Sequence, residues 1–304
     1  MKLHRYKITV RAIAESRLPG FLGSFVRGVF GETLKRYHPP AFQYFFKLRL
    51  PRQHPYFRFF GHNPPAPYWF YMPRRIRHLN PGDTFHFFFT HLYTPLLPPE
   101  AIPALFSHAF RRSLYRRQFH GTLAAVEPAG HRNSPLISLA DFKSAVQPAR
   151  NLRIDFPVPV TLIRNGKIIP PADMHSLFHF LIHRAMMLRR AASLFSDTER
   201  LFGHQPPPGD VESIPDIIRP ELVKSSQMNN LRTINFRLNK QTVYRSPKRH
   251  EKYPMRGWAG FVELEGNFPD LYKILKLGEA IHVGSNTSVG FGKFKITPDI
   301  SSVP

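Results

Sequence analysis

The stretch LHRYKITVRAIAESRLPGFLGSFVRGVFGETLKRYH (residues 3–38) decides the fold, because it changes from a strand pattern to a helix pattern. Residues 3–13 largely alternate between apolar and polar side chains, which predicts a half-buried strand. From about Phe21 to Tyr37 the apolar residues recur every three or four positions, which predicts an amphipathic helix. The apolar face of this helix is expected to contain Leu22, Phe25, Val29, Phe30 and Leu34.

Further strands and a second helix are expected after this stretch. The aromatic segments FQYFFKLRL, PYWFYMP and TFHFFFTHLY (42–50, 67–73 and 84–93) predict strands, and residues 98–119 predict a helix with apolar residues at four-residue steps. Strand, helix, strands, helix and strand is the ferredoxin-like pattern, in which both helices lie on one side of a sheet. This fold has many functions, so it does not by itself indicate one.

The pattern restarts in the second half of the chain. Residues 127–150 are polar and rich in turn residues, which predicts a boundary near residue 148. A strand at 151–167 and a long helix at 172–197 follow, and the remaining strands and short helix repeat the order of the first half. We therefore expect an α+β protein of two tandem ferredoxin-like domains, residues 1–147 and 148–304.

The composition indicates a globular protein that binds polyanions. The 304 residues are 42% hydrophobic and include 28 Phe, enough to form large cores. Lys and Arg number 43 against 20 Asp and Glu, a formal net charge of +23. Nucleic acid is the first expected partner, because its phosphates reward clustered cations through counterion release. An anionic membrane surface is the alternative, but no polybasic helix lies beside a hydrophobic span.

Several classes of protein are excluded by what the sequence lacks. The chain has no cysteine, which removes disulfides, thiolate zinc sites and cysteine nucleophiles. It has no run of about 18 apolar residues and no signal-peptide core at its beginning. We therefore expect a soluble, cytoplasmic protein without membrane contact, cofactor or bound metal.

The segment GEAIHVGSNTSVGFGKFKI (278–296) combines backbone freedom with positive charge. Its glycines at 278, 284, 290 and 292 permit positive φ and close backbone approach, and Lys293 and Lys295 follow directly. Turns use glycine for the same reasons, so this segment alone is a weak signal.

Five segments, in order, resemble those of a known family. They are LPGFLGSFVRGVFGETL, FFFTHLYTPLLP, IDFPVPVTLIRNGK, YRSPKRHEKYPMRGWAGFVELEG and LGEAIHVGSNTSVGFGKFKI. The chain thereby resembles the CRISPR repeat-processing endoribonucleases of the RAMP superfamily over nearly its whole length.

The resemblance implies a fold, an activity and a set of partners. Members consist of two tandem ferredoxin-like domains, the RAMP fold, with a C-terminal glycine-rich loop that contacts RNA. They bind the repeat of a precursor CRISPR RNA and cut it once per repeat without metal, as part of antiviral defence. The ribose 2′-hydroxyl is the nucleophile, and the product carries a 2′,3′-cyclic phosphate. Many members hand the product to an interference complex, and a monomer or homodimer is expected.

Two departures from the family keep other functions open. Many relatives have cysteines after the first helix, where this chain has HPPAFQYFFKLRLP. Many also have a His inside that helix, where this chain has Glu32. The main alternative is therefore a catalytically inactive RAMP-fold protein that binds repeat RNA as a subunit of a CRISPR ribonucleoprotein complex. A general RNA chaperone or ribosome-associated protein is the third possibility.

The cluster KRYHPP is the best candidate for the catalytic residues. Attack by a 2′-hydroxyl needs a base, an acid and cations that stabilise the phosphorane, and histidine suits proton transfer near neutral pH. Relatives place their catalytic His in or just after the first helix, which indicates His38 as the base. Lys35, Tyr37 and Arg27 are candidates to orient or stabilise the phosphate. His38 could instead only end the helix, and the other candidate bases are His54, His62 and His282.

Basic and glycine-rich segments near the C-terminus are the candidate RNA-binding residues. They comprise Arg245, Lys248, Arg249, His250, Lys252, Arg256, His282, Gly284, Ser285, Asn286, Gly290, Gly292 and Lys293. Closely spaced cations of this kind suit phosphate contacts, although a solvated basic face has the same pattern. For Arg111, Arg112, Arg116 and Arg117 the two interpretations are equally supported.

His175, His179 and His183 recur every four residues and therefore form one stripe on the predicted long helix. The outer two are about 12 Å apart along the helix axis. One zinc ion, with Zn–N bonds of about 2.0–2.1 Å, cannot bind all three. A pair of these residues with one ion remains an option, but a polar stripe that faces solvent or RNA is the preferred interpretation.

Overall fold

The computed structural model describes residues 1–18, 21–73, 78–111, 119–130, 136–138, 140–195, 226–245 and 253–298. The chain forms two compact units. The first consists of Met1–Ser138, Met187–Val211 and Arg245–Glu251, and the second of Leu139–Met186, Glu212–Tyr244 and Lys252–Pro304. The domain boundary predicted at 147/148 lies later in the chain than the change of unit after Ser138, and it stays a prediction.

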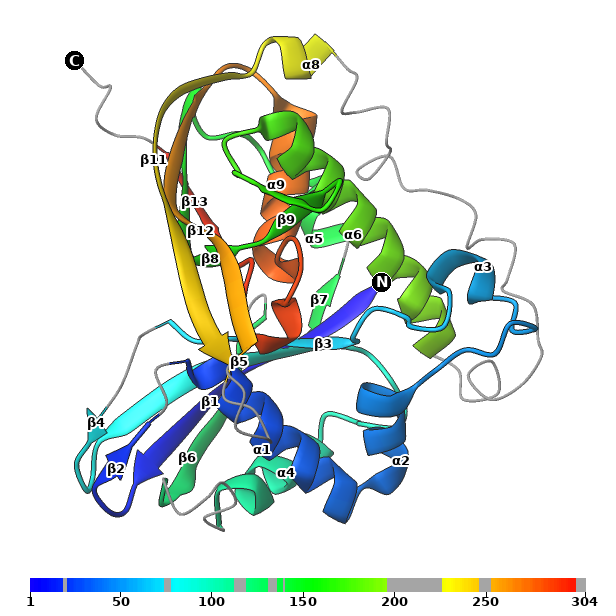
Figure 1. The fold of residues 1–304 in the computed structure, drawn as a ribbon, viewed down its shortest axis with the longest axis vertical. Helices are drawn as coiled ribbons and strands as arrows, with labels where there is room; N and C mark the ends of the chain where they lie inside the picture. Colours follow the sequence, from blue (N-terminus) through cyan, green and yellow to red (C-terminus); the bar gives the residue numbers. More distant parts are fainter. Residues whose placement is uncertain are drawn as a thin grey trace. The chain divides into compact units, whose positions relative to one another are not determined.

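The elements of the first unit follow the predicted order of strand, helix, strands, helix and strand (Figure 1). They are β1 (Lys2–Ala12), β2 (Ser16–Arg17), α1 (Leu22–Tyr37), α2 (Pro39–Phe42), the π-helix η1 (Gln43–Lys47), α3 (Phe57–Phe60), β3 (Tyr68–Tyr71), β4 (His78–Leu79), β5 (Thr84–Leu92), α4 (Ala101–Arg111), β6 (Gly121–Pro128) and β7 (Leu136–Ser138).

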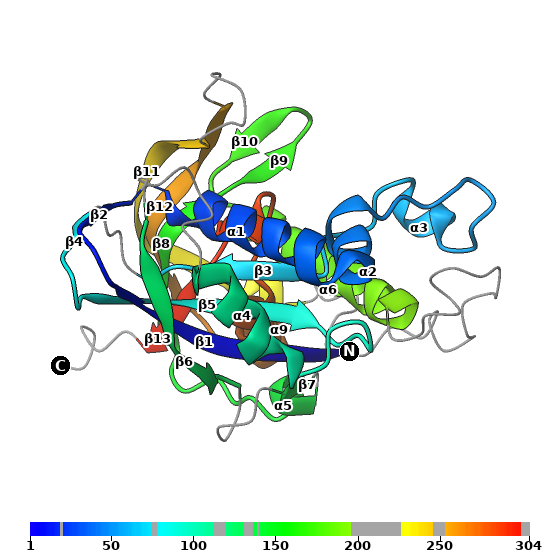
Figure 2. The ribbon, with the colours of Figure 1, turned by 90° about the horizontal axis from the view of Figure 1, so that it is seen from below.

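The main sheet of this unit has the strand order β3-β5-β1-β6, with β7 also paired to β1. Its pairs are antiparallel, and Ile8 of β1 lies opposite Phe87 of β5. The first strand therefore lies between the third and fourth strands of the motif, which is the ferredoxin-like topology. Helices α1 and α4 lie on the same face of the sheet (Figure 2).

The predicted apolar face of the first helix is confirmed. Leu22, Phe25, Val29, Phe30 and Leu34 are all buried. The ring of Phe30 is fully buried among other aromatic rings, and its centroid lies 5.0 Å from that of Phe89 on β5. This burial stabilises the contact between α1 and the sheet.

The strand predicted at 42–50 is wrong, because residues 39–47 form two short helical segments, α2 and η1. Pro39 and Pro40 occupy the first positions of α2, where a missing N–H costs no helical hydrogen bond. His38 supplies the N-cap, since its Nδ1 accepts a hydrogen bond from the Ala41 N–H at 3.2 Å. These start signals outweigh the strand preference of the aromatic run that follows.

The second unit repeats the topology. Its elements are α5 (Ala140–Lys143), β8 (Asn151–Val160), β9 (Leu162–Arg164), β10 (Lys167–Ile169), α6 (Met174–Phe195, of which the part from Met187 groups with the first unit), α8 (Ser226–Asn229), β11 (Arg232–Arg245), β12 (Tyr253–Glu265), α9 (Pro269–Ile281), the 3₁₀ turn η6 (Thr287–Val289) and β13 (Lys295–Pro298). The sheet order β11-β12-β8-β13 again places the first strand between the third and fourth. The predicted fold, two tandem ferredoxin-like domains of α+β class, is confirmed.

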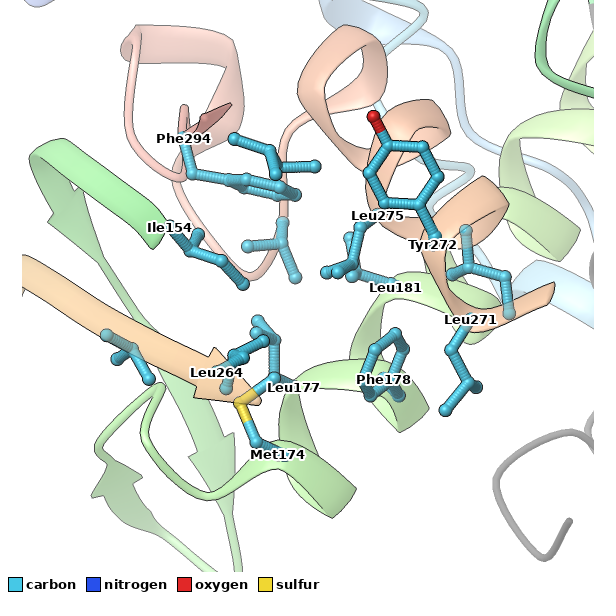
Figure 3. Close-up of a cluster of buried hydrophobic side chains, with 14 of the residues drawn as sticks. Ile154, Met174, Leu177, Phe178, Leu181, Leu264, Leu271, Tyr272, Leu275 and Phe294 are labelled. Carbon is cyan, nitrogen blue, oxygen red and sulfur yellow. The ribbon is translucent and has the colours of Figure 1, made fainter. Parts of the chain in front are cut away.

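The core of the second unit lies between its sheet and its two long helices (Figure 3). Leu177 and Leu181 of α6 and Leu275 of α9 point toward Ile154 of β8. All four are almost fully buried. This core fixes the C-terminal end of α9, from which the glycine-rich segment begins.

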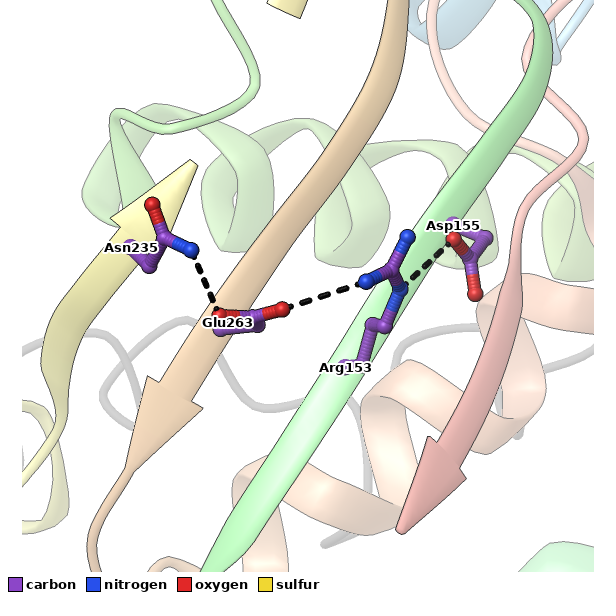
Figure 4. Close-up of polar contacts among 4 residues, drawn as sticks. All are labelled: Arg153, Asp155, Asn235 and Glu263. Carbon is purple, nitrogen blue, oxygen red and sulfur yellow. Dashed lines mark hydrogen bonds and ion pairs between the residues drawn. The ribbon is translucent and has the colours of Figure 1, made fainter. Parts of the chain in front are cut away.

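Four polar side chains of the second sheet form a connected network (Figure 4). Arg153 of β8 donates from Nε to Asp155 at 2.9 Å and from Nη1 to Glu263 of β12 at 3.2 Å. Asn235 Nδ2 of β11 donates to the same Glu263 carboxylate at 2.8 Å. The bond to Asp155, with smaller contributions from Glu263, raises the pKa of Arg153 above its usual value. The charge of Arg153 is therefore compensated by neighbouring carboxylates.

Among the described residues, no helix is both long and apolar enough to cross a membrane.

Candidate functional site

The glycine-rich segment is held against the end of strand β8 by backbone hydrogen bonds. Ser285 N donates to Thr161 O at 2.9 Å, and Gly292 N donates to Pro159 O at 2.9 Å. Val283 N donates to Gly292 O at 3.0 Å, which closes the loop on itself. Residues 283–292 therefore form a compact loop with a defined position in the second unit.

Two glycines of the loop are required by this close backbone packing. Gly284 and Gly292 have φ of +79° and +77°, a region that favours glycine. A Cβ on Gly284 would lie 2.3 Å from Thr161 O, and one on Gly292 would lie 1.9 Å from Val283 O. The glycine pattern therefore shapes the loop and fastens it to the sheet.

The tip of the loop presents polar side chains. Ser285 and Asn286 are exposed, whereas Gly290, with φ of +100°, is buried. The N–H groups of Val289 and Phe291 donate to Asn286 O, and the Gly290 N–H donates to Thr287 O. Several loop donors are thus used inside the loop, and the side chains of Ser285 and Asn286 are the groups that it offers to a ligand.

His282 and Lys293 flank the loop and are tied to the protein. His282 caps α9 at φ of +60°, is buried, and has its Nδ1 3.3 Å from Phe291 O. Lys293 is partly buried, and its Nζ donates to Glu279 O in the last turn of α9. A cation at that position complements the negative end of the helix dipole.

Arg184 of α6 holds the base of the loop from the core side. Its Nε donates to Ile281 O, the last residue of α9, at 2.7 Å. Burial lowers the pKa of Arg184 to about 10, so the guanidinium still carries its charge at neutral pH. The sequence pattern does not indicate this role, because periodicity does not show which cation of a helix is buried.

Arg256 of β12 is placed close to the attachment point of the loop. Its backbone carbonyl accepts a hydrogen bond from Thr161 Oγ1 at 2.6 Å, and the carbonyl of the same Thr161 holds Ser285. The side chain of Arg256 is exposed. Of the other cations predicted nearby, Lys248, Arg249, His250 and Lys252 lie outside the described residues, as does the side chain of Arg245.

A second cluster of predicted residues lies at the end of α1 in the first unit. Lys35 and Tyr37 are exposed, and His38 is partly exposed between α1 and α2. The His38 N–H donates to Leu34 O at 2.8 Å. The Tyr37 ring stacks on His108 of α4, with centroids 4.4 Å apart and planes 17° apart.

His108 is a member of this cluster that the sequence analysis missed. It belongs to the segment SHAF in the second helix, and only the packing of α4 beside α1 brings it to Tyr37. The expectation that both helices of a ferredoxin-like unit share one face of the sheet is the signal that would have suggested the pair.

Arg27 is not brought to His38. The two are separated by eleven residues of helix, or about 16 Å along its axis. Arg27 Nε instead donates to the Tyr68 hydroxyl at 3.0 Å, and its guanidinium lies 5.0 Å from the centre of the Phe46 ring.

The other candidate bases of the first unit are engaged within their own loop. His54 is buried, and its Nδ1 accepts a hydrogen bond from Tyr56 N at 3.2 Å. His62 is exposed, with Nδ1 3.0 Å from Leu50 O. Within the described part of the chain, no group of three His, Asp or Glu side chains is arranged to hold a metal ion.

Two family models match the chain. The model described as CRISPR-associated endoribonuclease Cas6 matches residues 154–294, which include the glycine-rich loop. A model described as an N-terminal domain matches residues 1–137. A search of curated proteins finds no match.

Solved structures share the fold over nearly the whole chain. A product complex of a Cas6 from Thermus thermophilus matches with a TM-score of 0.60 and 16% identity, over 97% of this chain and 100% of that one. A product complex of another Cas6 matches with a TM-score of 0.52 and 18% identity, over 98% of this chain and 100% of that one. A partial Cas6-RT-Cas1–Cas2 complex matches with a TM-score of 0.60 and 13% identity, over 100% of this chain and 47% of that one. Residues 154–294 thus match the model of the CRISPR-associated endoribonuclease Cas6 family, the solved structures show the same fold, and the resemblance indicated by the sequence segments is confirmed.

Proposed function

We propose that the protein binds a CRISPR repeat and cuts the precursor RNA within it, without a metal ion. The match of residues 154–294 to the Cas6 family is the observation that carries this proposal. The folded glycine-rich loop, the exposed Arg256 beside it and the net charge of +23 support RNA as the ligand.

The proposed reaction needs only side chains and the RNA itself. The 2′-hydroxyl loses a proton, its oxygen forms a bond to the neighbouring phosphorus, and the bond from phosphorus to the 5′-oxygen breaks. That 5′-oxygen takes up a proton, which leaves a 2′,3′-cyclic phosphate and a 5′-hydroxyl. Lys35 and Arg36, both exposed at the end of α1, are suitable cations for the charge that develops on the phosphate.

His38 is the proposed proton-transfer group, and its cap sets a condition on that role. Because its Nδ1 accepts the Ala41 N–H, the neutral ring carries its proton on Nε2. In this state Nε2 can donate a hydrogen bond but cannot accept a proton. To act as the base, the ring must leave the cap when RNA binds, which its partial exposure permits.

The RNA-binding groups are proposed to be the loop tip and the neighbouring cations. Ser285 and Asn286 are exposed and offer hydrogen-bonding side chains, and Arg256 offers a charge. Gly284, Gly290, Gly292, His282 and Lys293 hold the loop in shape. Two matched relatives are product complexes and one is part of a larger Cas complex. We therefore also propose that this chain retains its cleaved RNA and joins a CRISPR complex.

Incubation with labelled repeat RNA in EDTA tests the proposal. We expect one cut per repeat and a product whose 3′ end is a cyclic phosphate. RNA with a 2′-deoxy sugar at the cut site should be bound and remain intact, because its nucleophile is missing. Intact ordinary repeat RNA under conditions of tight binding would remove the claim of catalysis.

A protein that only binds repeat RNA is the second candidate function. Glu32, which is exposed on α1, stands where many relatives of the resembled family have a histidine, and the Nδ1 of His38 is occupied by the cap. Such a binder would give the same affinity for the deoxy and ordinary repeats and no product from either.

A further inference from the structure

The histidine stripe of α6 lines a groove that the proposed reaction does not use. The groove lies between α6 and the hairpin β9–β10, which are side by side in the second unit (Figure 1). Its volume is about 640 Å³, within the range of about 300–1,000 Å³ typical of ligand pockets. Its lining includes Ile163, Arg164, His175, His179, Phe180 and His183.

The chemistry of this lining suits an unpaired nucleotide. Arg164 is exposed and always charged, and the exposed imidazoles of His175, His179 and His183 offer N–H donors. Ile163 is 46% exposed and Phe180 is partly exposed, so a base has apolar and aromatic surface to lie against. Proteins recognise unpaired bases by stacking them on Phe and His rings and by binding the adjacent phosphates.

The geometry of the stripe also suits a nucleic-acid backbone. Successive histidines are one helical turn apart, about 6 Å along the axis. This distance is comparable to the spacing of successive phosphates in an extended strand. Among the residues that the structure describes, no acidic side chain lines the groove. Asp173, at the beginning of α6, accepts hydrogen bonds from Ser176 N and Oγ at 3.1 and 2.8 Å.

We propose that the groove between α6 and β9–β10 binds an unpaired segment of RNA, with a base against Phe180 and Ile163 and phosphates beside Arg164 and the histidines. The inference rests on the proposed function in that RNA is the ligand, but it assigns a surface separate from the α1 cluster and the glycine-rich loop. A chain of carboxylates such as polyglutamate would satisfy the cations but would gain nothing from the aromatic surface.

Photocrosslinking locates the ligand directly. The full chain is irradiated with a 4-thiouridine-containing oligouridylate and, separately, with repeat RNA carrying 4-thiouridine outside any hairpin, both in EDTA. We expect crosslinked peptides from residues 163–183 with both RNAs. Absence of crosslinks there with both RNAs overturns the proposal, as does displacement of oligouridylate by polyglutamate as readily as by unlabelled oligouridylate.

Variants then test the contribution of the side chains. The Kd for oligouridylate should rise about fivefold or more in Phe180→Leu, which keeps apolar volume but loses the ring, and in the triple variant His175→Ala/His179→Ala/His183→Ala. In Arg164→Ala, the magnitude of the slope of log K against log salt should fall by about 0.7, the value for one lost phosphate contact with a single strand. Arg17→Ala and His78→Ala, exposed residues of the first unit, are the matched controls and should leave both quantities unchanged.

The outcomes separate this proposal from the proposed function. If all groove variants cleave the repeat normally and bind oligouridylate with wild-type affinity, the groove proposal is overturned and the proposed function stands. If the protein neither binds nor cuts the repeat but its affinity for oligouridylate depends on the groove residues, the proposed function is overturned and the groove proposal stands. An effect of the histidine variants that appears only when Zn²⁺ is added also overturns the proposal, because it would assign the stripe to a metal.

Discussion

His38 combines a structural role with the proposed catalytic one, and alanine would remove both. It caps α2 through the Ala41 N–H, and it is the proposed proton-transfer group. Asparagine is a good N-cap but does not transfer protons near neutral pH, so it keeps the first role and removes the second.

We predict that His38→Asn and His38→Ala both slow single-turnover cleavage of repeat RNA by roughly 10²–10⁴-fold, with little change in Kd. Only His38→Ala should lower thermal stability, because it alone removes the cap. Cleavage by His38→Asn at the wild-type rate would show that the residue serves only to begin the helix. His62→Ala, an exposed histidine in a loop, is the comparison for loss of an imidazole elsewhere.

His91 makes the first unit sensitive to acid. It is completely buried on β5, opposite His4 of β1, with its Nδ1 2.8 Å from Leu92 O. Burial, with a smaller contribution from His4, lowers the pKa of His91 to about 3. An unfolded chain protonates this side chain near pH 6.5. Between these values the unfolded state binds the extra proton, so the free energy of unfolding falls as the pH falls.

We predict a loss of about 1.4 kcal/mol per pH unit from His91 in the range from pH 6 to 4.5. In His91→Leu the free energy of unfolding should fall less steeply with falling pH, by about 1.4 kcal/mol per pH unit, whatever the variant's stability at pH 7.5. Urea unfolding at four pH values measures the difference, and titration of the carboxylates is common to both proteins. Parallel pH profiles would contradict the burial of a neutral His91.

At the scale of the element, the glycine-rich loop depends on close backbone contacts more than on flexibility. Gly292 has φ of +77° and no room for a Cβ beside Val283 O. Gly166, in the β9–β10 turn, has φ of +72°, but a Cβ there would meet nothing within 4 Å. The two positions share a left-handed backbone conformation and differ in their surroundings.

We predict that Gly292→Ala destabilises the protein by more than Gly166→Ala. The latter should cost about 1–2 kcal/mol, the strain of an alanine in the left-handed region. Gly292→Ala adds a clash with a backbone carbonyl that cannot move without breaking its neighbours, so its Tm should fall further and its affinity for repeat RNA should drop. Equal Tm shifts in the two variants would show that the loop is not packed as described.

The elements differ in how far the sequence predicts them. The first helix and its buried face follow from the spacing of Leu22 through Leu34, because one period dominates that stretch. In residues 42–50 nearly every apolar position is aromatic, so no period stands out, and the prolines after His38 decide for helix. The stacking of Tyr37 on His108 joins two helices and cannot be read from either one alone.

At the scale of the whole molecule, a net charge of +23 does not show which cations are available to RNA. Arg153 is occupied by Asp155 and Glu263, and Arg184 is buried against Ile281 O. Arg256, Arg164 and Lys35 are exposed. Only the exposed cations release counterions when RNA binds, because the charges of Arg153 and Arg184 are already compensated or enclosed.

We predict that the affinity for repeat RNA falls steeply with salt and that individual arginines contribute unequally to this slope. Arg256→Gln should lower the magnitude of the slope of log K against log salt by about 0.7, the value for one phosphate of a single strand. Arg153→Gln, on a strand of the same sheet, should leave the slope unchanged, although it breaks two ion pairs. Fluorescence anisotropy at four salt concentrations with each variant measures both slopes. Equal changes in the two variants would mean that the protein's total charge, and not the position of its exposed cations, determines RNA binding.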